Sequence, residues 1–201
     1  IRNIAVLGHG SAGKTTLCEA LIYACGESDK IGNIADGSTL LDFDAEEKKR
    51  GCSISTAVYA AEYKDCKLNL LDAPGFFDFT AGVSEALTAA DAAIIATQDK
   101  MHYHLAMAAI DKGYHLLLEK PVAPTPKECL DISNEAIKKG VHVIVCHVLR
   151  FTPFFRLLKN IIDSGRIGRV INMVHVECVG NVHQSHSYVR GNWCNTKESS
   201  P

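Results

Sequence analysis

Short apolar runs alternate with helix-like segments along most of the chain. The run Asn3–Leu7 predicts a first strand that leads into a glycine-containing loop, and apolar spacing predicts a helix over 15–24. Residues 27–51 are mostly polar, so we expect a mobile loop with one short helical turn rather than core. The next two apolar stretches, 53–61 and 66–72, predict a hairpin.

Helix and strand patterns then alternate up to residue 179. Thr125 and Glu128 have the spacing of a capping box at a helix start. The alternation predicts a three-layer α/β fold around a mostly parallel, doubly wound sheet. The expected helices span 81–89, 104–112, 125–139 and 153–164, and the expected strands span 92–97, 115–119, 141–148 and 170–179.

Composition narrows the class of protein. Hydrophobic residues make up 47% of the 201 residues, enough for a substantial core. The formal net charge of −2 gives no electrostatic reason to bind nucleic acid, and no apolar run approaches the roughly 18 residues of a membrane span. The eight irregularly spaced cysteines indicate buried, reduced thiols and a cytoplasmic location. The pair His183 and His186 lacks partners at zinc-ligand spacing.

The loop from Gly8 to Thr15 fits the pattern GxxxxGKS/T between a strand and a helix. In such a loop backbone N–H groups point at phosphate oxygens, Lys14 reaches the β- and γ-phosphates, and Thr15 binds Mg²⁺. Asp72 follows an apolar strand, as expected for a residue that holds Mg²⁺ through water, and Ser53 supplies a second hydroxyl to the metal. The expected nucleotide contacts are Gly8, His9, Gly10, Ser11, Ala12, Gly13, Lys14, Thr15, Thr16 and Gly75, and the expected metal ligands are Thr15, Ser53 and Asp72.

The stretches GHGSAGKTT, KRGCSI and DAPGFFDF, in this order, make residues 1–96 similar to the GTPase domain of elongation factor G and other translational GTPases. The resemblance implies Mg²⁺ with GTP or another nucleoside triphosphate. Two positions depart from the family: Ser53 replaces the usual Thr, and Phe76 replaces the His that orients the attacking water. We therefore expect hydrolysis to be slow or absent.

The guanine-reading sequence NKxD of that family does not occur in the chain. The residues at its place are Glu119-Lys120-Pro121-Val122, and Val122 has no carboxylate to accept hydrogen bonds from guanine. Lys120 falls where the Lys of that motif lies. Selectivity for the guanine base is therefore expected to be weak.

The stretches AAIIATQDKMH, HLLLEKP, HVLRFTPFF and SGRIGRV make residues from about 89 to 201 similar to the Gfo/Idh/MocA oxidoreductases. That resemblance implies NAD(P), with Lys120 as the catalytic residue and His102 near the nicotinamide. Gly8–Gly13 also spells the dinucleotide pattern GxGxxG, but Lys14-Thr15-Thr16 after it favours a triphosphate. Because the family's own fingerprint and most of its substrate domain are missing, oxidoreductase activity is not expected.

The two resemblances meet at the strand expected over 92–97. We expect residues 1–96 and 97–165 to share one sheet with strand order near 2-3-1-4-5-6, and 166–201 to begin a truncated domain. Voids are expected at the seam, where unmatched helices pack. The strand 170–179 is a candidate edge for pairing with a second copy. Three hypotheses stay open: an NTP-binding domain, an NAD(P)-dependent oxidoreductase fragment and a non-catalytic chimeric scaffold.

Overall fold

The computed structural model describes residues 1–191 and 193–195. The chain divides into two compact units, Ile1–Val145 and Cys146–Pro201. The first unit contains the whole sheet, and the second consists of short helices joined by extended chain. No described helix is long and apolar enough to cross a membrane.

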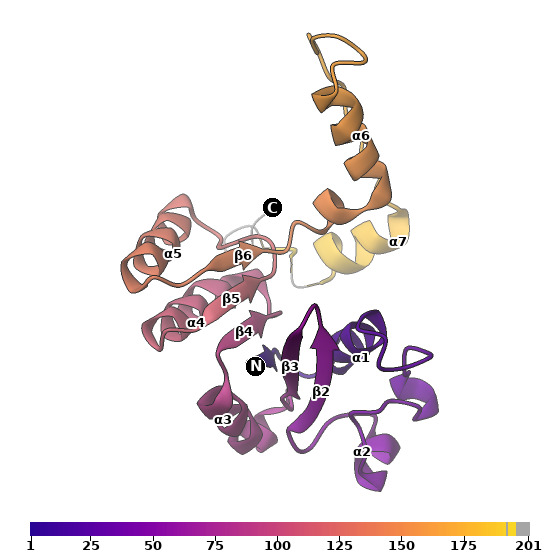
Figure 1. Cartoon of the computed structure of the whole chain (residues 1–201), viewed down its shortest axis with the longest axis vertical. Coiled ribbons are helices and arrows are strands. Elements are labelled where there is room, and N and C mark those ends of the chain that lie inside the picture. The colour runs from indigo at the N-terminus through magenta and orange to yellow at the C-terminus, as the bar shows by residue number, and fades with distance from the viewer. Residues whose placement is uncertain (192, 196–201) are drawn as a thin grey trace. The chain divides into compact units, whose positions relative to one another are not determined.

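A six-stranded sheet organises the first unit (Figure 1). Its order, β2-β3-β1-β4-β5-β6, confirms the predicted order. Neighbouring strands pair in parallel except β2 and β3, which form the predicted antiparallel hairpin. The strands are β1 (Arg2–Leu7), β2 (Ala57–Tyr63), β3 (Cys66–Asp72), β4 (Ala92–Ile95), β5 (His115–Leu118) and β6 (Val143–Val145).

Helices cover both faces of the sheet, as the three-layer prediction requires. The buried residues of α3, α4 and α5 pack against strand residues on one face of the sheet. The buried residues of α1 pack against strand residues on the other face. The helices of the first unit are α1 (Lys14–Ala24), α2 (Ala45–Arg50), α3 (Thr80–Ala89), α4 (Asp99–Asp111) and α5 (Pro126–Lys139). The capping box of Thr125 and Glu128 is present at the start of α5.

Period-two alternation in β1 sends neighbouring side chains to opposite layers. Ala5 packs in a cluster with Ala86 of α3, whereas Val6 packs in a cluster with Cys18 and Ile22 of α1. All of these residues are fully buried. The central strand therefore carries the core of both faces.

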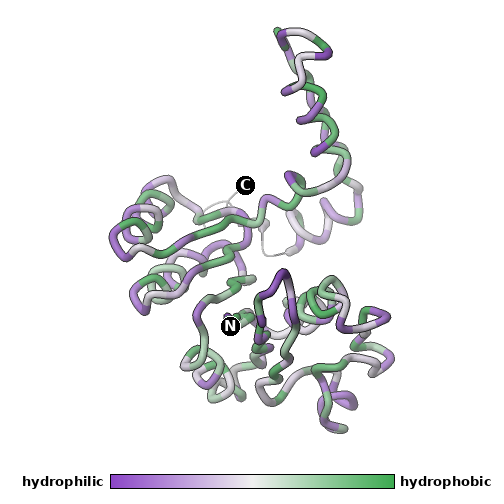
Figure 2. The backbone as a smooth tube through the Cα atoms, viewed as in Figure 1, coloured by the Kyte–Doolittle hydropathy of each residue, from purple (hydrophilic) through white to green (hydrophobic). Residues whose placement is uncertain are grey.

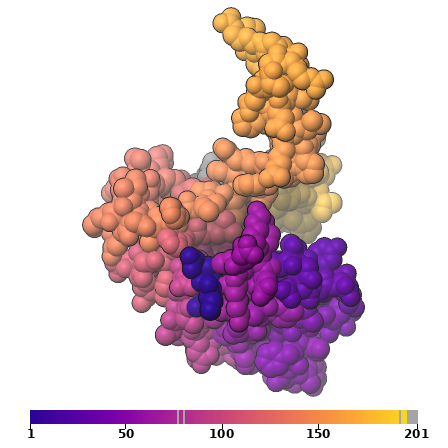
Figure 3. Space-filling model, viewed as in Figure 1, coloured from indigo at the N-terminus to yellow at the C-terminus, as the bar shows by residue number. Residues whose placement is uncertain are grey.

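The two halves of the sheet meet at β1 and β4. Ile4 pairs with Ala92 and Leu7 with Ile95 in a parallel ladder. At the start of this ladder the backbone N–H of Asn3 donates to Asp91 Oδ2 (2.8 Å). On its other side β1 pairs with β3. In Figure 3 the first residues of the chain therefore reach the surface beside the β2–β3 hairpin.

The polar segment 27–51 is more tightly held than the sequence predicts. Leu41 is only 3% exposed and joins the α1 core cluster, so the expectation that this stretch contributes nothing to the core is wrong there. The buried carboxylate of Glu19 accepts backbone N–H groups of Gly32, Leu40 and Leu41. Figure 2 shows the contrast between the hydrophobic strands and the hydrophilic chain around α2.

The second unit corrects one prediction. It contains η3 (Val148–Phe151), α6 (Pro153–Asp163), α7 (Asn181–Gln184) and a π-turn at Ser185–Val189, but residues 170–179 form no strand. Val174 and Val176, which stand on either side of His175 in the alternating pattern, are 82% and 75% exposed. Alternation produces a strand only where a neighbouring strand accepts its hydrogen bonds, and none of the described strands pairs with this segment. The proposed homodimer edge at 170–179 therefore loses its basis.

The cysteines also differ in part from expectation. All eight are free, but full burial is confirmed for Cys18 alone, while Cys178 and Cys194 are exposed.

Candidate functional site

The loop between β1 and α1 is built around a left-handed glycine. Gly13 has φ 80° and stands immediately before α1, a conformation that a side chain would strain. No side chain caps the helix start, so the first N–H groups of α1 remain free to meet a ligand. Together with the positive end of the helix dipole, these N–H groups favour an anion.

Lys14 adds a cation to the same loop. Its side chain is only 7% exposed, and Nζ donates to the backbone oxygen of His9 (2.9 Å). Burial lowers the pKa of Lys14, while the nearby Asp72 carboxylate acts in the opposite direction. The amine is thus held beneath the loop rather than free in solvent.

Four oxygen-bearing side chains from distant parts of the chain meet next to Lys14. The hydroxyl of Thr15 donates to Asp72 Oδ2 (2.6 Å) and lies 3.2 Å from Ser53 Oγ. Ser53 in turn donates to Asp42 Oδ1 (3.0 Å). One cluster of carboxylate and hydroxyl oxygens therefore combines residues from helix α1, from the end of β3, from the polar segment 27–51 and from Ser53 just after it.

Asp72 has an incompletely satisfied carboxylate. It is fully buried, and its Oδ1 has no hydrogen-bond partner among the described residues. Burial raises the pKa of Asp72 to about 6, against the opposing effects of the Thr15 hydrogen bond and Lys14. A buried oxygen without a partner calls for a ligand, and hard oxygen donors are those that Mg²⁺ prefers. The residues present therefore fit a magnesium ion.

Asp42 is a member of this cluster that sequence reasoning missed. It is 2% exposed, and Thr39 donates to its second oxygen (3.2 Å). It lies in a polar segment with no motif around it, so its only signal in the sequence is the apolar pair Leu40-Leu41 just before it. The burial of Leu41 brings Asp42 to the cluster.

Gly75 and Phe76 close the loop from the side of β3. A side chain at Gly75 would overlap Lys14 Nζ and the backbone of His9, so the backbone of residue 75 lies directly against the phosphate-loop motif. The ring of Phe76 lies over Gly10, where an added Cβ would come within 2.7 Å of it. Phe76 is still 45% exposed.

These groups line one cleft of about 330 Å³ with mixed polar and apolar walls. The cleft brings together the loop residues from Gly10 to Thr16, the predicted metal ligand Ser53, the predicted Gly75, and the unpredicted Asp42. Asp72 lies beneath it through its bond to Thr15. Gly8 and His9 precede this wall, and a side chain at Gly8 would meet the Ala96 oxygen at 2.7 Å.

The residues expected from the second resemblance lie elsewhere. Lys120 is exposed and does not line the cleft. His102 is 1% exposed, with Nδ1 2.6 Å from the Pro121 oxygen and Nε2 3.1 Å from the Thr97 oxygen. His102 thus ties the chain after β4 to the chain after β5. No cluster of three or more His, Cys, Asp or Glu suited to a metal occurs among the described residues.

Comparison with known families singles out the first half. The sequence profile of the Elongation factor Tu GTP binding domain matches residues 1–105. Elongation factor G 2 of Borreliella burgdorferi is 43% identical over 95 residues, which cover 47% of this chain and 14% of that protein. The mitochondrial ribosome-releasing factor 2 of Anopheles gambiae is 42% identical over 95 residues, or 47% and 13% of the two chains. The chain therefore spans about a seventh of the length of these relatives.

Solved structures share the fold across both halves. An NAD binding oxidoreductase from Klebsiella pneumoniae superposes with TM-score 0.51 and 20% identity, covering 84% of this chain and 40% of that one. The probable oxidoreductase yhhX gives TM-score 0.54 and 19% identity, covering 85% and 42%. At this level of identity the likeness concerns the arrangement of the sheet and its helices.

Proposed function

Because the chain belongs to the family of the Elongation factor Tu GTP binding domain, we propose that it binds a nucleoside triphosphate, with GTP as the family's ligand, together with Mg²⁺, and hydrolyses it slowly or not at all. The observation that carries the proposal is the cluster in which Lys14 and the unpartnered oxygen of Asp72 lie beneath a glycine loop. The matched relatives are far longer, so the proposal is limited to the nucleotide and does not extend to the relatives' further activities.

The phosphates are proposed to lie on the loop Gly8–Thr16. Gly13 supplies the turn that directs backbone N–H groups inward, and the uncapped start of α1 adds further donors. The Lys14 ammonium neutralises the β- and γ-phosphates from below. The backbone of Gly75 is close enough to Lys14 for its N–H to serve the γ-phosphate.

Thr15, Ser53, Asp42 and Asp72 are proposed to hold Mg²⁺ through their clustered oxygens. The ion, when bound, neutralises charge on the β- and γ-phosphates. Its binding also gives the unpartnered Oδ1 of the buried Asp72 a positive partner, in addition to the nearby Lys14.

The chemical step is proposed to be weak because of Phe76. Water must be oriented by a hydrogen-bonding group to attack the γ-phosphate in line. A phenyl ring has no such group, and this one lies over Gly10 instead. We therefore expect the chain to bind a triphosphate and to cleave it slowly.

Base selectivity is proposed to be low. The position at which the related GTPases read guanine is occupied here by Glu119-Lys120-Pro121-Val122. The Glu119 carboxylate accepts the backbone N–H of Lys120 at 2.8 Å, and Val122 brings no acceptor. We expect GTP and ATP to bind with affinities within about one order of magnitude, because the hydrogen bonds that would distinguish guanine from adenine are missing here.

A titration of the full chain with a non-hydrolysable GTP analogue and Mg²⁺ tests this function. We expect saturable binding that Lys14→Ala abolishes and that the surface control Lys127→Ala leaves unchanged. Stabilisation by the analogue of about 2.7 kcal/mol is expected at a hundredfold excess over Kd. Stabilisation by NAD⁺ instead would favour the oxidoreductase reading, and no shift with either nucleotide would favour a non-catalytic scaffold.

A further inference from the structure

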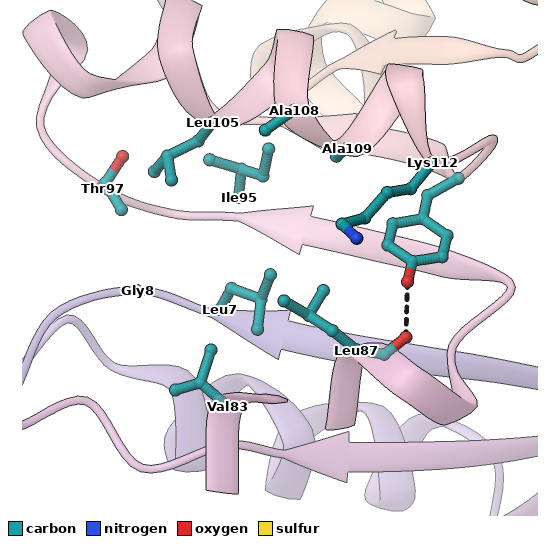
Figure 4. A pocket seen from close by; sticks show the side chains of 11 residues that line it. Leu7, Gly8, Val83, Leu87, Ile95, Thr97, Leu105, Ala108, Ala109 and Lys112 are labelled. Atoms are coloured by element: carbon teal, nitrogen blue, oxygen red, sulfur yellow. Dashed lines mark hydrogen bonds between the residues drawn. The ribbon is translucent and has the colours of Figure 1, made fainter. Parts of the chain in front are cut away.

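The sheet face covered by α3 and α4 contains a second cleft, of about 270 Å³, whose walls are almost entirely apolar (Figure 4). Leu7 of β1 and Ile95 of β4 form its floor. Val83 and Leu87 of α3 lie on one side, and Ala108 and Ala109 of α4 on the other. The cleft thus lies beside β1 and β4, the two strands at which the predicted halves meet.

The small side chains of α4 explain why the void stays open. Ala108 and Ala109 face the cleft where larger residues would reach α3. Tyr114 bridges the gap at one end, with its hydroxyl donating to the Leu87 oxygen (2.6 Å), as the dashed line in Figure 4 marks. The Tyr114 hydrogen bond therefore joins the two sides at one end of the cleft, and α3 and α4 stay apart in the middle of it.

Water gains little in the middle of this cleft. A buried water needs two to four polar partners. The Tyr114 hydroxyl already donates to Leu87, and the Thr97 hydroxyl at the other end donates to the Gln98 oxygen (3.4 Å). An apolar occupant would remove the partly exposed Leu7, Val83 and Leu87 from water at no polar cost. The volume exceeds the roughly 150 Å³ of an apolar cavity that holds benzene, so about six to ten carbons fit.

A single cation lines this cleft. Lys112, just after the end of α4, extends its amine toward it (Figure 4). Its neighbour Asp111 is paired with Lys139 at 2.7 Å. Within 1–191 and 193–195 the Lys112 amine forms no hydrogen bond or ion pair. Its charge helps to lower the pKa of Asp111, but that carboxylate is already bonded to Lys139.

We propose that this cleft binds a small apolar monocarboxylate, with its hydrocarbon part between α3 and α4 and its carboxylate at the Lys112 ammonium. The charge of Lys112 selects an acid over an amine, and the apolar lining selects a hydrocarbon over a sugar or nucleotide. The two clefts share no lining residue, although Gly8 at the start of the phosphate loop lines this one.

The test is an NMR titration of the full chain, labelled at its methyl groups, with octanoate, octanol and octylamine below their micelle-forming concentrations and without nucleotide. We expect saturable octanoate-induced shifts at Leu7, Val83, Leu87 and Ile95. Octylamine is expected to bind at least tenfold more weakly than octanoate. Equal binding of the amine and the acid, or shifts centred on other residues, would overturn the assignment.

Two variants sharpen the result. Lys112→Gln should weaken octanoate about three- to fivefold, in the range of an exposed ion pair, without changing octanol binding, and the matched control Lys127→Gln should change neither. Ala108→Leu, at the solvent-facing rim, should block all three ligands while the chain stays folded. Octanoate binding that survives Ala108→Leu would show that the ligand lies outside this cleft.

Discussion

Thr15 donates its hydroxyl hydrogen to Asp72 at 2.6 Å, and this single bond joins the first turn of α1 to the end of β3. It satisfies one carboxylate oxygen of Asp72 and leaves the other buried without a partner. The nucleotide-free chain therefore keeps a destabilising feature at the place where a metal would relieve it.

The first prediction concerns pH. The pKa of Asp72 is about 6 in the folded chain against 3.8 ordinarily, so the folded state holds this proton more tightly than the unfolded state. Stability from this group is then highest below about pH 4 and falls as pH rises toward 6. The difference of about two units corresponds to about 3 kcal/mol. Urea unfolding at pH 4 and pH 7, without Mg²⁺ or nucleotide, measures it.

Asp72→Asn is the matched variant. It keeps an acceptor for Thr15 but cannot ionise, so its stability should lack the decline between pH 4 and 6 and should exceed that of the parent chain at pH 7 by about 2 to 3 kcal/mol. The same variant should lose Mg²⁺-dependent nucleotide binding. A parallel decline in both proteins would assign the pH dependence to other groups.

Gly75→Ala should damage the loop through space alone. The new methyl group overlaps Lys14 Nζ and the His9 backbone, so the loop must shift. We expect a loss of about 1 to 3 kcal/mol in unfolding free energy and at least tenfold weaker binding of a GTP analogue. Gly180→Ala is the control, since no atom lies within 4 Å of its added Cβ, and it should bind like the parent chain.

Phe76→His should raise the rate of GTP hydrolysis. Imidazole supplies the hydrogen-bonding group that a phenyl ring lacks, and positioned groups of this kind contribute roughly 100-fold or more. A gain of about 10- to 100-fold in single-turnover phosphate release is expected, with little change in affinity for the analogue. Phe76→Leu removes the ring without adding a polar atom, so its hydrolysis rate should not rise. An equal rise in both variants would mean that removing the ring from Gly10, and not the new imidazole, speeds hydrolysis.

Glu19→Ala should loosen the segment that carries Asp42. The buried carboxylate accepts three backbone N–H groups, from Gly32, Leu40 and Leu41, and all three lose their partner in the variant. We expect a destabilisation of about 3 kcal/mol and faster hydrogen exchange at these three amides. Glu27→Ala removes a comparable but exposed contact to the Glu62 amide, and should cost less than about 1 kcal/mol.

Much of the fold could be predicted because its signals are local. The alternation of Asn3–Leu7, the glycine loop and the helix starts each follow from neighbours in sequence, and the strand order follows from the βαβ rule. The strand expected over 170–179 failed because its alternation needs a partner strand that is not adjacent in sequence. Asp42 was missed for a similar reason: it reaches the site through the burial of Leu41 and the hydrogen bonds of Glu19.

The position of β1 at the centre of the sheet has a consequence for how the chain acquires its structure. Its partners are β3, more than sixty residues later, and β4, almost ninety residues later. Closing these long loops costs conformational entropy before the strand pairs form. The contact order is therefore high, and we expect slow folding. A fragment ending after β4 would present the unpaired edge Ala92–Ile95, so we expect it to aggregate more readily than the whole chain.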